Sequence, residues 1–116
     1  MADIKLTEAE IQQRLAALPA WRIEQGALRR TYRTDGWRGS MLVANAIAFV
    51  CEAADHHADL TVTWPSVAVA LSTHSAGGIT GKDFEVAVLI EAQVLWKPPV
   101  GSSLTGPSKP FVQDSG

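Results

Sequence analysis

Apolar residues recur along the chain with two different periods, which predict three helices and four strands. Ile11, Leu15 and Leu18 follow one another at helical spacing, and Pro19 ends that run. Other segments place apolar side chains on every second residue, which is typical of a strand. The periods predict helices at about 8–18, from Trp37 to about Ala54 and from after Thr80 to about Trp96, and strands at Trp21–Glu24, Leu28–Arg33, Leu60–Trp64 and Val67–Thr73.

Capping and turn residues mark where several of these elements begin and end. Thr7 with Glu10, and Thr80 with Asp83, fit the capping box, in which each side chain satisfies a backbone N–H group of the first helical turn. Residues 25–26, Gln-Gly, separate the first two strands as a hairpin turn would. These boundaries are therefore set by local sequence.

The second and third predicted helices are apolar on more than one side. The second helix carries two apolar faces, namely Leu42, Ala46, Phe49 and Ala53, and Met41, Ala44, Ala48 and Cys51. The third carries Phe84, Ala87, Val88 and Leu95 on one face, and Val86, Leu89, Ile90 and Val94 on another. A helix of this kind needs cover on two sides, so we expect a homo-oligomer, either a homodimer or a homotetramer.

The order of elements, α-β-β-α-β-β-α, predicts an α+β fold: an antiparallel four-stranded sheet with three helices packed on one face. We expect this domain to span residues 1–96. Residues 97–116 differ, because they contain four Pro, three Gly and four Ser and few large apolar groups. We interpret them as a tail that is mobile or lies on the surface.

Composition and charge exclude several classes of protein. The 116 residues are 47% hydrophobic and 19% charged, which is typical of a globular domain rather than a disordered or coiled-coil chain. The net charge of −2 offers no basic surface for nucleic acid, and one cysteine, Cys51, excludes an internal disulfide. The first residues lack the pattern of a signal peptide, and no apolar run is long enough to span a membrane. We therefore expect a cytoplasmic protein without a membrane partner.

The candidate chemistry lies with the three histidines, which fall within nineteen residues. Glu52 precedes His56 by four residues, so on a continuing helix its carboxylate would share a face with that imidazole and fix its tautomer. His57 follows directly, and His74 closes the predicted fourth strand. Imidazoles exchange protons near neutral pH, so this group is suited to general acid–base catalysis.

Structural roles without catalysis are alternative interpretations of the same residues. The macrodipole alone favours a His-His pair at a helix C-terminus, and Asp83 is accounted for by its cap. Trp64 is typical of a packing aromatic, and Cys51 of a small buried apolar residue. A zinc site formed by the three histidines and a carboxylate is disfavoured, because adjacent residues of a helix project about 100° apart.

The spacing of these residues resembles the pterin-4a-carbinolamine dehydratase family over about residues 5–96. The family pattern has an acidic residue, three residues, His-His, an aromatic residue, a histidine ten positions later and an aspartate at the start of the last helix. In this chain the pattern corresponds to Glu52, His56-His57, Trp64, His74 and Asp83. The chain departs from the pattern in two places: it has Ala58 where the family has proline, and Trp64 where many members have tyrosine.

The resemblance implies an enzyme that removes water from a 4a-hydroxytetrahydropterin, in cofactor recycling of the tetrahydrobiopterin type, with no metal or other cofactor. His56 and His74 would be the general acids or bases, His57 would mainly hold the pterin, Glu52 would orient His56, and Asp83 would support His74. The implied catalytic residues are His56, His57, His74 and Glu52. The implied pterin-binding residues are Asp55, His56, His57, Trp64, Ser72, Thr73, His74 and Asp83.

The resemblance leaves one alternative of another class. Relatives of this fold act as dimerisation cofactors of transcription factors or as assembly chaperones, so the chain could be a non-catalytic binding module. The three histidines with Glu52 and Asp83 favour the enzyme, because a pure adaptor has no use for them.

Overall fold

The computed structural model describes residues 3–113 and contains the predicted helices and strands in the predicted order. The elements are α1 (Glu8–Leu15), β1 (Arg22–Glu24), β2 (Ala27–Arg33), α2 (Trp37–Ala54), β3 (Asp59–Thr63), β4 (Ser66–Leu71), the 3₁₀ helix η1 (His74–Ala76) and α3 (Gly81–Val94). The bounds of α2 agree with the prediction, and both capping boxes form. Two helices are shorter than predicted: α1 ends at residue 15 and α3 at residue 94.

The four strands form one antiparallel sheet in the order β1-β2-β4-β3. Two hairpins therefore lie side by side, joined through the register that pairs Leu28 with Leu71. The turn of the first hairpin has positive φ at both Gln25 (51°) and Gly26 (72°), the backbone twist that suits a two-residue hairpin. One face of β4, formed by Val67, Val69 and Leu71, is buried as the alternation predicts.

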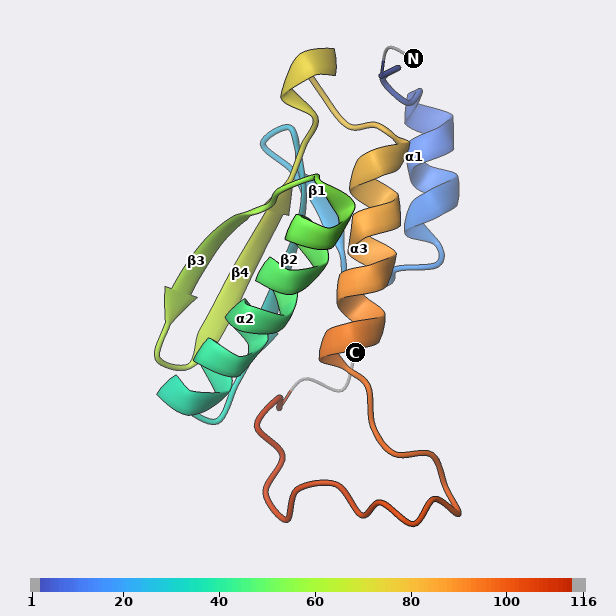
Figure 1. Cartoon of the computed structure of the whole chain (residues 1–116). Helices are drawn as coiled ribbons and strands as arrows, with labels where there is room; N and C mark the ends of the chain where they lie inside the picture. Colours follow the sequence, from blue (N-terminus) through green and yellow to red (C-terminus); the bar gives the residue numbers. More distant parts are fainter. Residues whose placement is uncertain (1–2, 114–116) are drawn as a thin grey trace.

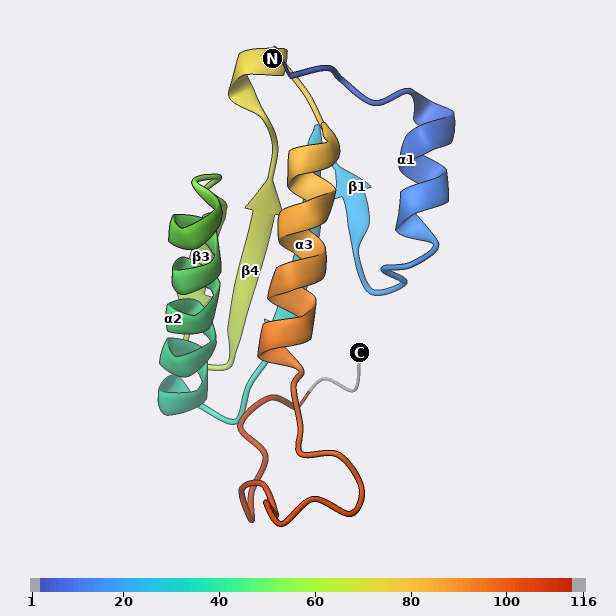
Figure 2. The same cartoon turned by 45° about the vertical axis from the view of Figure 1, so that its right-hand side comes forward.

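Helices α2 and α3 cover one face of the sheet, and α1 lies beside α3 on the side away from α2 (Figures 1 and 2). The predicted α+β arrangement is therefore confirmed. The core lies between this helical layer and the sheet, and α2 contributes Val43, Ile47 and Val50 to it. The opposite face of the sheet carries the alternate residues of each strand, such as Arg29 and Thr31 of β2.

Each of the two long helices has one buried and one uncovered apolar side. On α2, Phe49 is 71% exposed and Leu42 is also exposed. On α3, Val88 and Leu89 are exposed, and Trp96 just beyond it is exposed too. The buried sides differ from the predicted groupings. On α2 the core takes Val43, Ile47 and Val50, which neither predicted face contains, and on α3 it takes residues from both predicted faces.

The C-terminal segment loops away from the helices after α3, and its end returns to the start of α2 (Figure 1). The N–H of Asp35 donates to the carbonyl of Phe111 at 3.0 Å, and Thr34 forms a β-bridge with Val112. Gly39 makes this approach possible, since a Cβ there would lie 2.8 Å from the Phe111 oxygen. The end of the segment is thus bonded to the domain. Residues 114–116, like residues 1–2 at the start of the chain, lie outside the described residues. No helix within residues 3–113 is both long and apolar enough to cross a membrane.

Candidate functional site

Three elements meet at one end of the sheet and carry the candidate site. They are the C-terminal end of α2, the turn η1 that follows β4, and the first turn of α3 (Figure 1). Helix α2 ends because Asp55 adopts a left-handed conformation (φ 54°), and its N–H donates to carbonyls of the last turn. The chain leaves the helix at this point, so His56 and His57 do not continue its face.

His56 turns inward and bonds to Asp83 of α3. Its Nε2 lies 2.6 Å from Oδ1 of Asp83, the shortest contact of the site. The His56 side chain is 13% exposed and that of Asp83 is 0% exposed. The pair therefore joins the end of α2 to the start of α3 away from water, where a hydrogen bond to a charged group is strong.

The second carboxylate oxygen of Asp83, Oδ2, accepts hydrogen bonds from the N-cap of α3 and from the segment that follows β4. Oδ2 accepts from the hydroxyl of Thr73 at 2.8 Å and from the backbone N–H of Thr80 at 2.9 Å. The Thr80 hydroxyl, which lies 2.8 Å from the Thr73 hydroxyl, completes the network. Because two donors occupy Oδ2, Asp83 accepts the Nε2–H of His56 through Oδ1, which leaves Nδ1 as the free nitrogen of that ring.

His57 turns outward and bonds to Glu52. Nε2 of His57 lies 2.9 Å from Oε2 of Glu52, and the two side chains are 56% and 82% exposed. The sequence indicated that Glu52 would orient His56, and this was wrong. The expected pairing needs a helix that continues through His56, whereas the left-handed turn at Asp55 ends it two residues earlier.

His74 lies on η1 rather than at the end of a strand, and its side chain is exposed. Among residues 3–113 no side-chain hydrogen bond of His74 is present, so the expected support from Asp83 is absent. Thr73, the preceding residue, bonds to Asp83 in its place: its hydroxyl donates to Oδ2, whereas His74 lies on η1 and is exposed. His74 therefore offers its ring to solvent on the same rim as His56.

Two further residues predicted to bind the pterin, Asp55 and Ser72, lie at this end of the sheet. A third, Trp64, does not. Asp55 is exposed at the α2 C-cap, and Ser72 is half-buried just after β4. Trp64 lies in the turn between β3 and β4, at the end of the sheet opposite to His74, and is 65% exposed. The five residues of β3 separate it from the histidine pair by roughly 16 Å, so in one chain it does not reach the site.

The residues alone indicated only a helix cap at Thr80 and Asp83, and the family resemblance assigned Asp83 to the support of His74 and to the pterin. The structure shows that the same carboxylate also holds His56, so the cap fixes a site residue. The spacing Thr80-Gly-Lys-Asp83 signals only the cap, because the partner histidine lies 27 residues earlier in the chain. Within residues 3–113, no three His, Cys, Asp or Glu side chains gather as metal ligands would.

Other polar and hollow regions lie apart from the histidines. Glu91 of α3 accepts through Oε1 from the Tyr32 hydroxyl (2.6 Å), Arg30 Nε (3.2 Å) and Trp21 Nε1 (3.1 Å), and so anchors α3 to β2. Burial, and then the bond to Glu91, raises the pKa of Tyr32 well above its ordinary value of 10. Cys51 is buried as expected, and that burial raises the pKa of its thiol.

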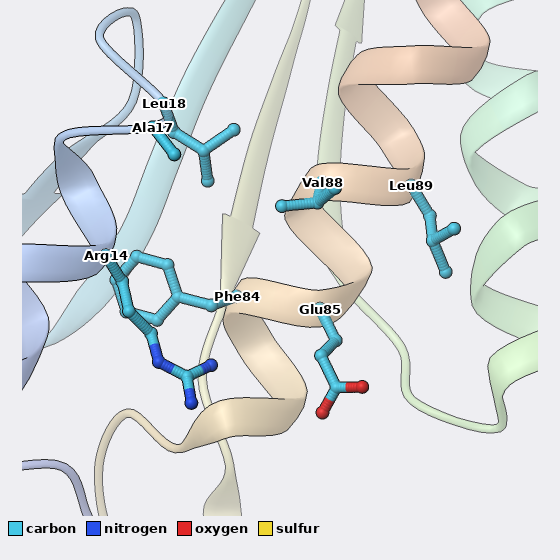
Figure 3. A pocket seen from close by; sticks show the side chains of 7 residues that line it. All are labelled: Arg14, Ala17, Leu18, Phe84, Glu85, Val88 and Leu89. Atoms are coloured by element: carbon cyan, nitrogen blue, oxygen red, sulfur yellow. The ribbon is translucent and has the colours of Figure 1, made fainter.

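A hollow of about 480 Å³ lies between α1 and α3 (Figure 3). Arg14 and Glu85 are its charged residues, and the guanidinium of Arg14 lies 6.0 Å from the centre of the Phe84 ring. Most of the lining is apolar, and none of the histidines contributes to it. The residues suited to proton transfer are therefore those around His56.

Residues 4–93 match a family model described as "Pterin 4 alpha carbinolamine dehydratase". A protein from Roseiflexus castenholzii named "Putative pterin-4-alpha-carbinolamine dehydratase" is 40% identical over 86 residues, which cover 74% of this chain and 92% of that protein. A protein of the same name from Streptomyces coelicolor is 42% identical over 87 residues, 74% of this chain and 86% of that one.

A solved structure also resembles the chain. It is described as a "transcriptional coactivator/pterin dehydratase" from Brucella melitensis. The two share 28% identity and superpose with a TM-score of 0.73 over 78% of this chain and 98% of the other. The likeness therefore extends to nearly all of that neighbour and leaves about a fifth of this chain without a counterpart there.

Proposed function

Because this chain belongs to the pterin-4a-carbinolamine dehydratase family, we propose that it converts a 4a-hydroxytetrahydropterin to the quinonoid dihydropterin and water. The observation that carries the proposal is the contact between Nε2 of His56 and the buried carboxylate of Asp83. This contact fixes one imidazole with a known free nitrogen at the rim where His74 is exposed. We include in the proposal that the pterin is of the tetrahydrobiopterin type and that the reaction recycles such a cofactor.

The reaction requires two proton transfers and no oxidant or reductant. The C4a–O bond breaks and the hydroxyl leaves as water after it receives a proton. N5 loses its proton, and its electron pair forms the double bond between N5 and C4a. One group must therefore donate a proton to the leaving oxygen, and another must accept one from N5.

His56 and His74 are suited to these two transfers. His56 presents Nδ1, because Nε2 is held by Asp83. His74 makes no side-chain hydrogen bond within residues 3–113, so both of its nitrogens are open to a substrate. Its backbone continues directly from Thr73, whose hydroxyl is bonded to the same Asp83. The network around Asp83 thus holds His56 directly and fixes Thr73, the residue that precedes His74.

The remaining residues are proposed to hold the pterin. His57 is oriented by Glu52 at 2.9 Å, and both are exposed and able to bond to a ligand rich in donors and acceptors. Asp55, Ser72 and the backbone of η1 extend the polar rim. We assign Glu52 to His57, in place of the assignment to His56 that the sequence indicated.

The test is the rate of dehydration of freshly generated 4a-hydroxytetrahydropterin, followed for the wild type, His56→Ala and His74→Ala. Loss of a general acid or base lowers such a rate by roughly 10²- to 10⁴-fold. The pH profile separates the two roles, because each variant should lose the limb of a bell-shaped curve that its imidazole provides. A folded wild type that does not accelerate the reaction would contradict the proposal.

A second candidate is a binding module that acts without catalysis, as a dimerisation cofactor or an assembly chaperone. The name of the Brucella melitensis protein and the uncovered apolar sides of α2 and α3 favour it. It predicts a folded, oligomeric wild type with no dehydration activity, so the same rate measurement decides between the two.

We also propose that the chain forms a homodimer or homotetramer through these apolar sides. Phe49, 71% exposed on α2, offers the most direct test. Phe49→Asp should reduce the mass in light scattering to that of one 12.4 kDa chain, because a charge would be buried unpaired in the interface. A wild type that is already monomeric would contradict this part.

A further inference from the structure

The segment before α1 crosses the rim of the site and is bonded to two of its elements. It runs from beside η1 to α1 (Figure 2). The N–H of Leu6 donates to the carbonyl of Ile79 at 2.9 Å, which holds the segment against the loop before α3. Nearer the N-terminus, the Asp3 carboxylate accepts from the hydroxyl of Ser75 at 3.0 Å and from Nζ of Lys82 at 3.1 Å.

The two partners of Asp3 are the immediate neighbours of two site residues. Ser75 follows His74 on η1, and Lys82 precedes Asp83 in the first turn of α3. Asp3 therefore bridges the turn that carries His74 to the helix end that holds His56. No other side chain within residues 3–113 bonds to both of these elements from outside the site.

The position of Lys82 is a second observation in favour of a bridge. It is the second residue of α3, where the positive end of the helix macrodipole disfavours a cation. The carboxylate of Asp3 offsets this unfavourable position. The Lys82 amine, and then the Ser75 hydroxyl, hold the pKa of Asp3 below its ordinary value, so the bridge is charged at neutral pH.

We propose that Asp3 is a positioning residue for the dehydration: it fixes η1, and with it His74, relative to the His56–Asp83 pair. Asp3 lies one residue before the segment that matches the family model. The inference rests on the proposed function in one respect: an effect of Asp3 on the rate requires dehydration activity. The effect of Asp3 on the backbone of η1 does not require it. Two measurements therefore test it separately.

The first measurement is kinetic. Asp3→Ala and Lys82→Ala should each lower kcat by about fivefold, the effect that one partly exposed ion pair can carry. KM should stay within twofold, because neither residue is assigned to the pterin. The charge-exchanged double variant Asp3→Lys with Lys82→Asp should recover most of the lost rate, which a general loss of stability would not do. Glu24→Ala, which breaks an exposed ion pair of similar kind on β1, serves as the matched control.

The second measurement is hydrogen exchange of the η1 amides, which does not depend on activity. The N–H groups of Ala76 and Gly77 close this turn on the carbonyls of Thr73 and His74. In Asp3→Ala they should exchange about fivefold faster, while the amides of β4 stay unchanged.

The two measurements separate the inference from the function on which it rests. Unchanged exchange and unchanged kcat in Asp3→Ala would overturn the bridge. Single variants that are impaired but not rescued by the charge exchange would overturn it as well. Faster exchange in a chain whose wild type has no dehydration activity would support the bridge and contradict the proposed function.

Discussion

Replacing Asp83 by asparagine tests the central contact of the site, because the two side chains have the same shape. Oδ2 of Asp83 accepts from Thr73 and from the N–H of Thr80. An amide nitrogen cannot accept either bond, so the oxygen of Asn must take that position and the NH₂ group must face His56. Nε2 of His56 then has to accept instead of donate, and its proton moves to Nδ1. The imidazole ring stays in place but in the other tautomer. Its Nδ1 then carries a proton and can no longer accept one.

The expected effects on rate and on stability differ in size. Loss of one correctly protonated imidazole should lower kcat by about 10²- to 10⁴-fold. The free energy of unfolding should fall less, by about 1–3 kcal/mol, since each bond to the carboxylate is replaced by a weaker neutral one. Asp83 is fully buried, so water does not screen this difference. More than 90% of the variant should therefore remain folded if the wild type has ordinary stability of roughly 5–15 kcal/mol.

The assay combines the dehydration rate with urea unfolding of the same preparations. The chain provides a matched control in its other capping box, where the backbone N–H of Thr7 donates to Glu10. Glu10→Gln makes the same carboxylate-to-amide change at a helix start without a histidine partner, so it should cost a little stability and no activity. An Asp83→Asn variant that is folded and turns over within about threefold of the wild type would refute the reasoning from the tautomer.

Three other changes test separate parts of the structure. His57→Ala should raise KM by about tenfold and change kcat little, because an exposed binding contact is lost; steady-state kinetics would contradict this if kcat fell instead. The raised pKa of Tyr32 means that the unfolded chain loses this proton at lower pH than the folded one. The free energy of unfolding should therefore fall as pH rises above 10, and less steeply in Tyr32→Phe; equal slopes in denaturation curves would count against it. Gly39→Ala should cost about 1–3 kcal/mol in thermal unfolding, since its Cβ meets the carbonyl of Phe111; an unchanged midpoint would show that the tail moves aside freely.

Local sequence accounts for most of the fold. The capping boxes at Thr7 and Thr80, the hairpin turn at residues 25–26 and the bounds of α2 were all predicted, because each depends on neighbours within a few positions. The alternation in β4 likewise predicted its buried face. The 3₁₀ turn η1 was missed, since three residues are too few to show a period.

The pairing of acids with histidines could not be read in the same way. The sequence identified the histidines and both carboxylates, but both predicted pairs were wrong. Glu52 was expected beside His56, and Asp83 was expected beside His74. The left-handed turn at Asp55 decides that His56 faces Asp83 and His57 faces Glu52. Aspartate is one of the few non-glycine residues that adopt this conformation with some frequency, but a single such residue produces no periodic signal in the sequence.

The helices and strands, their order and the residue types available for proton transfer could be predicted from the sequence, because they follow from the chemistry and spacing of near neighbours. Which of these residues share a site depends on how the elements pack together. This packing brings Asp83 to His56 across 27 positions and Asp3 to Lys82 across 79, and it leaves Trp64 at the far end of the sheet. Contacts at such separations depend on how the whole chain packs, so no local pattern records them.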